Sequence, residues 1–485
     1  MQGNAADRRY WDERIETMAP AELRQLEGPL IAEQIAYVYA MSPYYRGKFE
    51  AAGVQPDKVT CVEALETIPF TEKADITLAQ RAGALFGPHQ CAPFEDIVRI
   101  VATGGTSGQP TRIGWTASDA ELYSEMGARA LWANGCRPGD FVINCFNYSL
   151  YAGGIMDHMA FEHMGAGILP YGAGRSERLL DLLSNLPTHG VPGAYTLYST
   201  PSYAIRLHGL AQTRRLDLKS LNFRKGIFSG EPGLQIPGYR AQVEEAWGMV
   251  AMDLYGAAEV GAQSGECEHQ CGLHYGANGL VVAELIDPET GTVRRMESDA
   301  IGELVFTTLR RRACPLIRLR THDTVRVFTE PCACGRTSFR FQTLGRSDDM
   351  FIVKGMNIFP LSVQESLLLL RPEVTGEFFV ILDKAPPIDY PPRVCVEVAQ
   401  DLPPGRFAAL EHDLIAAIQA RSNFTPALEF VRAGSIASEH KTRRLYRAYA
   451  GVARPSLDTI NSRIDAGVHH EHRKQDDRER AVGDD

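Results

Sequence analysis

The chain has 485 residues, of which 44% are hydrophobic and 23% charged, and its formal net charge is −10. The length exceeds what one hydrophobic core usually serves, so we expect two domains of a globular protein. The acidic balance disfavours a nucleic-acid partner, which would need a basic stripe. No apolar run reaches the ~18–20 residues that span a bilayer, and the first residues lack the apolar core of a signal peptide. We therefore expect a cytoplasmic protein without a membrane partner, whose ten cysteines are thiols or metal ligands and not disulfides.

The first half of the chain changes from helices to alternating strands and helices. Residues 1 to about 75 are predicted to be helical, with an apolar stripe at Leu30, Ile31, Ile35 and Val38. From residue 97 to about 232, short apolar runs alternate with amphipathic segments. The expected strands are 97–102, 141–145, 167–170 and 226–229, and the expected helices are 117–134 and 175–185. Strands that alternate with helices indicate a layered α/β domain.

The second half of the chain first becomes rich in strands and then changes again. Strands are predicted at 280–286, 302–307 and 325–328, with a turn at 287–291. A smaller α+β unit follows, with strands at 350–353, 378–381 and 394–398 and helices at 360–370 and 406–419. We predict a large α/β domain with a β-rich subregion over 1–343, a hinge at 344–348, and a small mobile α+β domain over 349–465. The charged stretch 466–485 is nearly without large apolar residues and is predicted to be disordered.

A stretch rich in glycine and hydroxyl groups, 101–115, carries a chemical signal. A run that has the pattern of a buried strand leads into Thr103-Gly104-Gly105-Thr106-Ser107-Gly108. Glycines allow positive φ and a close approach to a ligand, and hydroxyls with clustered backbone N–H groups suit phosphate oxygens. The stretch is not a Walker A loop, because no Gly-Lys-Ser/Thr follows, and not a dinucleotide fingerprint, because no helix opens from the glycines. Taken alone, a stretch of this kind is more often a plain turn.

Two later motifs complete a known pattern. The segments 253–259 (DLYGAAE) and 345–349 (GRSDD) follow the loop in the order found in the adenylate-forming superfamily. The whole chain resembles a phenylacetate–CoA ligase-type member of it, from Tyr10-Trp11 through 42–46 (SPYYR) and 69–71 (PFT) to about Tyr449. The resemblance implies a ligase that uses ATP to convert an aromatic or arylacetic acid to acyl-AMP, releases pyrophosphate, and passes the acyl group to coenzyme A. Two alternatives stay open, namely another acceptor (a carrier-protein thiol, an amine or a hydroxyl) and a degenerate member that binds without turnover.

The resemblance also assigns roles to single residues. Glu259 is expected to bind Mg²⁺, which prefers oxygen ligands. Lys441 is expected to stabilise the charge that develops between the carboxylate and the α-phosphate, with a solvated lysine in a basic run as the alternative. Asp323 would bind the ribose hydroxyls and Arg346 the ribose or phosphate side, while Asp348 matches the hinge at which the small domain rotates. Further ATP contacts are expected at Thr103, Gly104, Gly105, Thr106, Ser107, Gly108, Glu231, Tyr255 and Gly256.

The acid pocket is the least specific part of this assignment. By the same resemblance, it would be lined by Tyr148, Phe228, Gly230, Ala257 and Ala258. Three positions depart from the family pattern: Ala258 stands where a threonine is usual, and His322 and His440 stand where glycines are usual. Near the phosphate loop, Arg112 is the one cation that the local sequence offers. A homodimer is left open.

A group of cysteine and histidine residues has the pattern of a metal site. Cys267 and His274 precede the pair Cys332 and Cys334, and such residues from two loops form closed tetrahedral zinc sites. The same spacing occurs in zinc-containing relatives of the family that the chain resembles. We expect structural Zn²⁺ on these four residues, with His269 and Cys271 as competing ligands. Buried reduced cysteines are the alternative.

Overall fold

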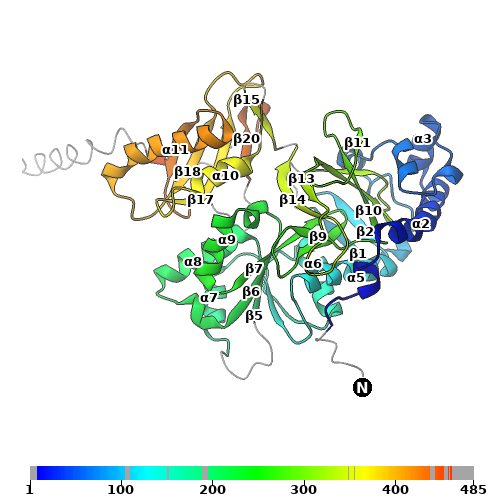
Figure 1. The fold of residues 1–485 in the computed structure, drawn as a ribbon, viewed down its shortest axis with the longest axis horizontal. Coiled ribbons are helices and arrows are strands. Elements are labelled where there is room, and N and C mark those ends of the chain that lie inside the picture. Colours follow the sequence, from blue (N-terminus) through cyan, green and yellow to red (C-terminus); the bar gives the residue numbers. More distant parts are fainter. Residues whose placement is uncertain are drawn as a thin grey trace, which may run out of the picture. The chain divides into compact units, whose positions relative to one another are not determined.

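The computed structural model describes residues 8–103, 110–149, 152–187, 195–347, 349–353, 356–436, 443–452, 457 and 459–460. The chain divides into two compact units, Met1–Ser347 and Asp348–Asp485 (Figure 1). This division falls inside the segment 344–348, whose action as a hinge stays a prediction. The segment 466–485, predicted to be disordered, lies outside the described residues.

The large unit is built on a 12-stranded sheet with the order β11-β10-β12-β13-β14-β9-β8-β7-β6-β5-β3-β4. Its parallel part consists of β3 (Phe141–Asn144), β4 (Gly167–Pro170), β5 (Tyr195–Ser199), β6 (Phe223–Phe228) and the start of β7 (Val250–Ala257). Its antiparallel part consists of β8 (Gly261–Glu266), β9 (Leu273–Tyr275), β10 (Val281–Ile286), β11 (Val293–Arg294), β12 (Ile301–Thr308), β13 (Leu319–Phe328) and β14 (Arg340–Arg346).

The two parts of the sheet meet at β7. Residues 250–253 of β7 pair in parallel with β6, and residues 254–257 pair antiparallel with β8. In open α/β sheets, ligands bind outside the carboxyl ends of the parallel strands. Tyr148, Gly230 and the end of the 253–259 motif follow the carboxyl ends of β3, β6 and the parallel half of β7. The topology therefore brings the predicted acid and nucleotide residues to one edge of the sheet.

The helices of the large unit cover this sheet. They are α1 (Glu13–Glu16), α2 (Pro20–Met41), α3 (Pro43–Ala51), α4 (Lys73–Arg81), α5 (Ala117–Ala133), α6 (Ala152–His163), α7 (Ser176–Ser184), α8 (Pro201–Thr213) and α9 (Pro237–Trp247), with 3-10 turns at Pro56–Lys58, Glu63–Thr67, Phe94–Asp96, Leu218–Leu221 and Pro232–Gln235. Figure 1 shows α7, α8 and α9 beside β5, β6 and β7. α5 lies directly on β8, where a Cβ on Gly265 would stand 2.2 Å from the Ala130 carbonyl oxygen. No helix among the described residues has the length and apolar character needed to cross a membrane.

The strand predicted at 97–102 differs from expectation. β1 (Arg99–Ala102) pairs with β2 (Arg112–Trp115) as a separate two-stranded ribbon outside the large sheet. Its second half is buried, but Ile100 is 40% exposed and Val98, just before it, is 61% exposed. The strand is therefore present over 99–102, but the expectation that the run is buried holds only for its second half.

The small unit has its own core and a five-stranded sheet with the order β20-β17-β18-β19-β21. Its elements are β15 (Phe351–Val353), β16 (Met356–Ile358), α10 (Pro360–Leu368), β17 (Val374–Leu382), β18 (Arg393–Val398), a 3-10 turn (Pro404–Arg406), α11 (Phe407–Ser422), β19 (Ala427–Val431), β20 (Leu445–Arg447), a 3-10 turn (Ala448–Ala450) and β21 (Thr459–Ile460). Side chains of both helices and the sheet share one apolar cluster, which includes Leu367, Val380 and Leu414. The predicted fold class, an α/β domain with a β-rich subregion and a small α+β unit, is confirmed.

Candidate active site

The turn that follows β7 presents Glu259. At Gly256 a Cβ would stand 2.9 Å from Ala262 Cα, so only glycine allows β7 and β8 to approach this closely. The chain then reverses through a turn in which Val260 N–H donates to the Ala257 carbonyl (2.9 Å). The carbonyl of Glu259 itself accepts from Arg311 Nη1 (2.7 Å) and from the Tyr123 hydroxyl (3.2 Å). These contacts fix the backbone that carries the candidate metal ligand.

The carboxylate of Glu259 is buried, being 9% exposed, and it forms an ion pair with Lys73 Nζ at 2.5 Å. Burial raises the pKa of this carboxyl, but the charge and hydrogen bond of Lys73, helped by Arg346, outweigh burial and hold the pKa below its ordinary value. The group is therefore ionised at neutral pH. An ionised carboxylate in a protected position is a suitable ligand for Mg²⁺, which commonly binds through one or two carboxylates and the substrate phosphates.

Lys73 was missed by the sequence analysis. Arg112, the cation expected near the phosphate loop, is half-buried and donates to the carbonyls of Leu85 (2.9 Å) and Ala84 (3.1 Å). The cation that reaches Glu259 comes instead from the first residue of α4, far away in the sequence. A signal was present, because Lys73 follows the 69–71 motif by two residues. Local spacing could not show that this segment returns to the end of β7.

Asp323 and Arg346 lie opposite each other on β13 and β14. The Tyr255 hydroxyl donates to Asp323 Oδ2 (2.6 Å), and Arg346 Nη1 donates to the Thr321 carbonyl (3.0 Å) and approaches Asp323 Oδ1 (3.4 Å). Burial, followed by the neighbouring carboxylate, raises the pKa of Tyr255 well above its ordinary value, so its hydroxyl stays a donor. The structure thus brings Tyr255, Asp323 and Arg346 together.

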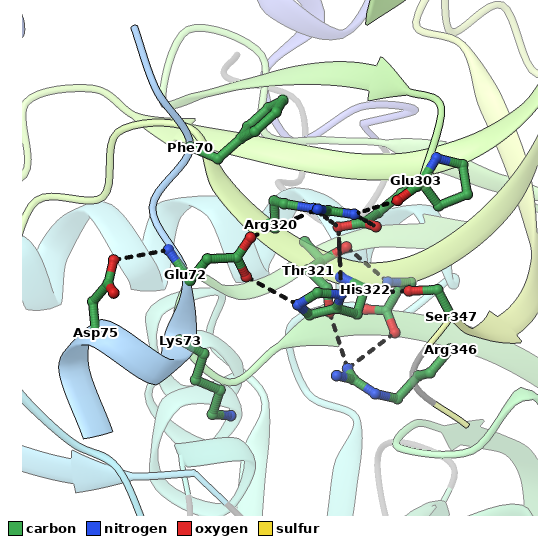
Figure 2. A network of polar contacts seen from close by, with 12 residues as sticks. Phe70, Glu72, Lys73, Asp75, Glu303, Arg320, Thr321, His322, Arg346 and Ser347 are labelled. Carbon is green, nitrogen blue, oxygen red and sulfur yellow. Dashed lines mark hydrogen bonds and ion pairs between the residues drawn. The ribbon is translucent and has the colours of Figure 1, made fainter. Parts of the chain in front are cut away.

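His322 occupies the position at which the family pattern has a glycine, and it keeps the conformation that a glycine would permit. Its φ is +61°, in the left-handed region, which costs a non-glycine residue about 1–2 kcal/mol. Figure 2 shows its ring between Glu72, which precedes α4, and Ser347. His322 therefore adopts a backbone conformation that suits glycine, and its side chain has partners on both sides.

Several predicted residues of the phosphate and transfer machinery fall outside the described residues: Gly104, Gly105, Thr106, Ser107, Gly108, Asp348, His440 and Lys441. Thr103, at the edge of the loop, is buried, and it exchanges hydrogen bonds with Thr111 across the loop (Thr103 N to Thr111 O 3.0 Å, Thr111 N to Thr103 Oγ1 3.2 Å). These two bonds close the base of the loop and so set where it begins and ends.

The predicted acid-pocket residues differ in how deeply they are buried. The Tyr148 hydroxyl accepts from Asn144 Nδ2 (2.7 Å) and pairs with His158 Nδ1 (2.9 Å). Gly230 has φ +86°, while Ala257 and Ala258 are half-buried against the large core. Phe228, the last residue of β6, is fully buried in a core cluster, and its contact with the acid stays a prediction.

Glu231, expected beside the adenine, precedes the 3-10 turn Pro232–Gln235, and its side chain reaches the start of α8. Its carboxylate accepts from the Ser202 backbone N–H (3.3 Å) and from the Ser202 hydroxyl (3.0 Å). An acidic side chain at a helix N-terminus is stabilised by the exposed N–H groups there. This contact connects the segment after β6 to α8, and the adenine role of Glu231 stays a prediction.

The four predicted metal ligands converge. One ligand atom from each of Cys267, His274, Cys332 and Cys334 lies within 4.8 Å of the others. Cys334 Sγ stands 3.4 Å from His274 Nε2, and Cys267 Sγ stands 3.6 Å from Cys332 Sγ. Of the two competing ligands, His269 lies beside Glu268 (3.7 Å), whereas Cys271 is exposed with its Sγ 3.5 Å from Cys332 Sγ.

A segment near the start of the described residues contacts the loop that carries Cys332 and Cys334. The Tyr10 hydroxyl donates to the Cys334 carbonyl (2.9 Å), and Glu16 binds Arg336 Nε (2.7 Å). The fit is close, since a Cβ on Gly335 would stand 2.4 Å from the Tyr10 hydroxyl. We call residues 9–18 the N-terminal strap.

Comparison with known proteins places this geometry in a family. No protein-family model matches the chain. The phenylacetate–coenzyme A ligase of Thermus thermophilus is 34% identical over 379 residues, which cover 77% of this chain and 81% of that protein. The corresponding enzyme of Aromatoleum evansii is 32% identical over 380 residues, with the same coverage. The chain belongs to the phenylacetate–CoA ligase family.

A solved structure agrees with this membership in the phenylacetate–CoA ligase family. A 2-hydroxyisobutyryl-CoA ligase, crystallised with its acyl-AMP in a postadenylation state, is 29% identical, with a TM-score of 0.83 over 92% of this chain and 95% of that one. That enzyme has also been crystallised with acyl-AMP and CoA in a thioesterification state. The prediction of an AMP-forming acid–CoA ligase is therefore confirmed: the enzyme uses ATP to form an acyl-AMP and transfers the acyl group to coenzyme A.

Proposed function

We propose that this ligase acts on an aromatic or arylacetic carboxylic acid. The observation that carries the proposal is the 32–34% identity to phenylacetate–CoA ligases over most of their length. Small residues stand at the strand ends, the half-buried Ala257 and Ala258 after the parallel half of β7 and Gly230 after β6, and Tyr148 follows β3. Small residues next to a tyrosine suit a flat ring. The rival is a small branched acid, such as the one named for the 2-hydroxyisobutyryl-CoA ligase.

In the adenylation step, the chain's own residues orient ATP and stabilise charge. The 103–108 loop receives the triphosphate, Asp323 and Arg346 hold the ribose side, and Lys73 keeps Glu259 ionised. Mg²⁺ bound at Glu259 would neutralise triphosphate charge. Lys441 donates to the charge that develops as the acid's carboxylate oxygen attacks the α-phosphorus and pyrophosphate leaves. Rotation at Asp348 then admits the thiol of coenzyme A.

Exchange of labelled pyrophosphate into ATP tests this proposal, because it reports acyl-AMP formation without an acceptor. The panel is phenylacetate, benzoate, 2-aminobenzoate and 2-hydroxyisobutyrate. We expect exchange to require an added acid and magnesium and to be fastest with an aryl or arylacetic acid. Faster exchange with 2-hydroxyisobutyrate would overturn the aromatic assignment. Exchange with none of the acids would count against all four as substrates.

The substitution Ala258→Thr tests how the acid is held. If the methyl of Ala258 replaces a hydroxyl that contacts the reacting centre, threonine should raise kcat for phenylacetate or benzoate by about tenfold, since about 1.4 kcal/mol corresponds to a factor of ten. If the small side chain instead makes room for an ortho substituent, threonine should lower activity on 2-aminobenzoate and leave benzoate nearly unchanged. Steady-state kinetics on both acids distinguishes the two. Equal rates for wild type and variant on both acids would place Ala258 outside the reacting centre.

We further propose that Cys267, His274, Cys332 and Cys334 hold a structural zinc ion. Three thiolates and one imidazole match the closed tetrahedral set of structural sites, and the four ligand atoms already lie within 4.8 Å of one another. The exposed position of Cys271 makes it a neighbour of the site and not a fifth ligand.

Metal analysis of protein purified without chelator should find one zinc per chain. Cys332→Ser should lose the metal and melt at a lower temperature, because binding at such a site contributes to folding. The matched variant Cys271→Ser, which changes a thiol only 3.5 Å from the same sulfur, should keep both the zinc and the melting temperature. Zinc loss in Cys271→Ser and not in Cys332→Ser would reverse the ligand assignment, and zinc-free wild type with full stability would remove the site.

A further inference from the structure

The two ring nitrogens of His322 contact different parts of the large unit. Its Nε2 lies 3.2 Å from Glu72 Oε2, and its Nδ1 lies 3.4 Å from Ser347 Oγ and 3.8 Å from Glu303 Oε1 (Figure 2). The backbone of His322 takes part as well, because its N–H donates to Glu303 Oε1 (3.1 Å) and its carbonyl accepts from Ser347 N–H (2.7 Å).

His322 and its partners Glu72 and Ser347 are each next in the sequence to a residue of the proposed active site. Glu72 directly precedes Lys73, whose ammonium pairs with Glu259. Asp323 is the next residue after His322, and its N–H donates to Thr321 Oγ1 (3.0 Å). Ser347 follows Arg346 and is the last residue of the large unit. The imidazole is therefore a short bridge between the lysine on the phosphate side and the carboxylate on the ribose side.

The other charged groups near Glu72 show which contact the His322 ring adds. Arg320 forms a two-pronged pair with Glu303 (3.0 and 2.7 Å) and lies 3.7 Å from Glu72. Glu303 is thus already paired, and its side chain is fully buried. Glu72 is the more exposed carboxylate, and the His322 ring is what joins it to the β13 turn at hydrogen-bond distance. Without the ring, the Glu72 carboxylate would keep the longer contact with Arg320 and its capping contact within α4, while Thr71 would still bond to β13 through its backbone.

We propose that His322 is a positioning residue for adenylation, which sets Lys73 against Glu259 by anchoring Glu72 to the turn that carries Asp323. The proposal rests on the proposed roles of Lys73, Glu259 and Asp323. The backbone conformation at position 322 does not require a histidine, because glycine adopts φ +61° without strain. The effect of His322 should therefore appear in adenylation, where ATP still carries its β- and γ-phosphates. It should not appear in thioester formation, where only acyl-AMP is bound.

The test compares the two half-reactions in His322→Gly. We expect KM for ATP in pyrophosphate exchange to rise about five- to tenfold, as for loss of one ordinary hydrogen bond. The rate of thioester formation from supplied acyl-AMP and CoA should change less than twofold. The melting temperature should not fall, because glycine relieves the left-handed strain. Arg215→Gly replaces an exposed residue that also has positive φ (+57°) and is the matched control, expected to leave both half-reactions unchanged.

A double-mutant cycle separates anchoring from a general effect. Glu72→Gln alone should raise KM for ATP to a similar extent, and adding it to His322→Gly should raise KM little further, because both remove one shared contact. Additive effects would show that the two residues act independently and would overturn the proposal. So would an unchanged KM in His322→Gly, or an equal loss in both half-reactions together with a lower melting temperature. Wild type without exchange activity would instead count against the proposed function itself.

Discussion

Replacing Lys73 by methionine should lower kcat/KM for ATP in pyrophosphate exchange by one to two orders of magnitude. The lysine stands 2.5 Å from the buried carboxylate of Glu259. A hydrogen bond between charged groups contributes about 1.5–3 kcal/mol, and about 1.4 kcal/mol corresponds to a tenfold change in rate. Methionine keeps the length and apolar stem of the side chain, so the loss reports the charge. Arg112→Met, which removes a cation that faces only the carbonyls of residues 84 and 85, should have little effect.

The same variant should also change the pH dependence. In the wild type the Lys73 ammonium offsets burial and keeps the pKa of Glu259 below its ordinary value, so the carboxylate stays ionised well below neutral pH. In Lys73→Met, burial acts with little opposition and the pKa of Glu259 rises above its ordinary value. The acid limb of kcat/KM should therefore move to higher pH. An acid limb at the wild-type position would show that Lys73 does not control the ionisation of Glu259.

Lys441→Ala should reduce acyl-AMP formation by about 100- to 1,000-fold, the loss typical for removal of one donor to a developing negative charge. ATP should still bind, because the lysine acts mainly in the transition state. Thioester formation from supplied acyl-AMP should be spared, and single-turnover measurement of the two half-reactions checks this. Arg443→Ala, two residues away in the same basic run, is the matched control and should retain adenylation. Equal loss of both half-reactions in Lys441→Ala would assign the lysine to the fold.

Much of the fold could be predicted because it follows from local periodicity. Segments such as α5 (Ala117–Ala133) and β12 (Ile301–Thr308) have a strong helical or strand pattern and lie within two residues of the predicted bounds. β8 (Gly261–Glu266) was missed, since its sequence GAQSGE has no apolar alternation. It is nevertheless fully buried, because small residues there let α5 lie directly on the sheet. Close packing of this kind selects for small size and not for hydrophobicity.

The site was predictable where a motif contains its own ligands and not where distant segments meet. The resemblance and the order of the motifs predicted Glu259, Asp323 and the four metal-site residues, and the structure brings the ligand atoms of those four together. The pairing of Lys73 with Glu259 joins segments that are far apart in the sequence, and no local pattern encodes such a pair. The role of His322 was hidden for a second reason. As a departure from the glycine that the resemblance leads one to expect, it indicates a changed turn, whereas the structure shows a positive φ and a ring with partners at Glu72 and Ser347.

The N-terminal strap has a consequence for the order of events during synthesis. The Tyr10 hydroxyl binds the Cys334 carbonyl across a sequence separation of 324 residues. At a translation rate of about 5–20 residues per second, the strap leaves the ribosome about 16–65 s before its partner exists. The contact of the strap with Cys334 is thus made late, whereas Trp11 and Asp12 of the strap find their partners on α5, Glu125 and Arg129, much earlier. A bulky fusion at the amino end would be present before the strap can bind the Cys334 carbonyl. A fusion at the carboxyl end would be made only after Cys334.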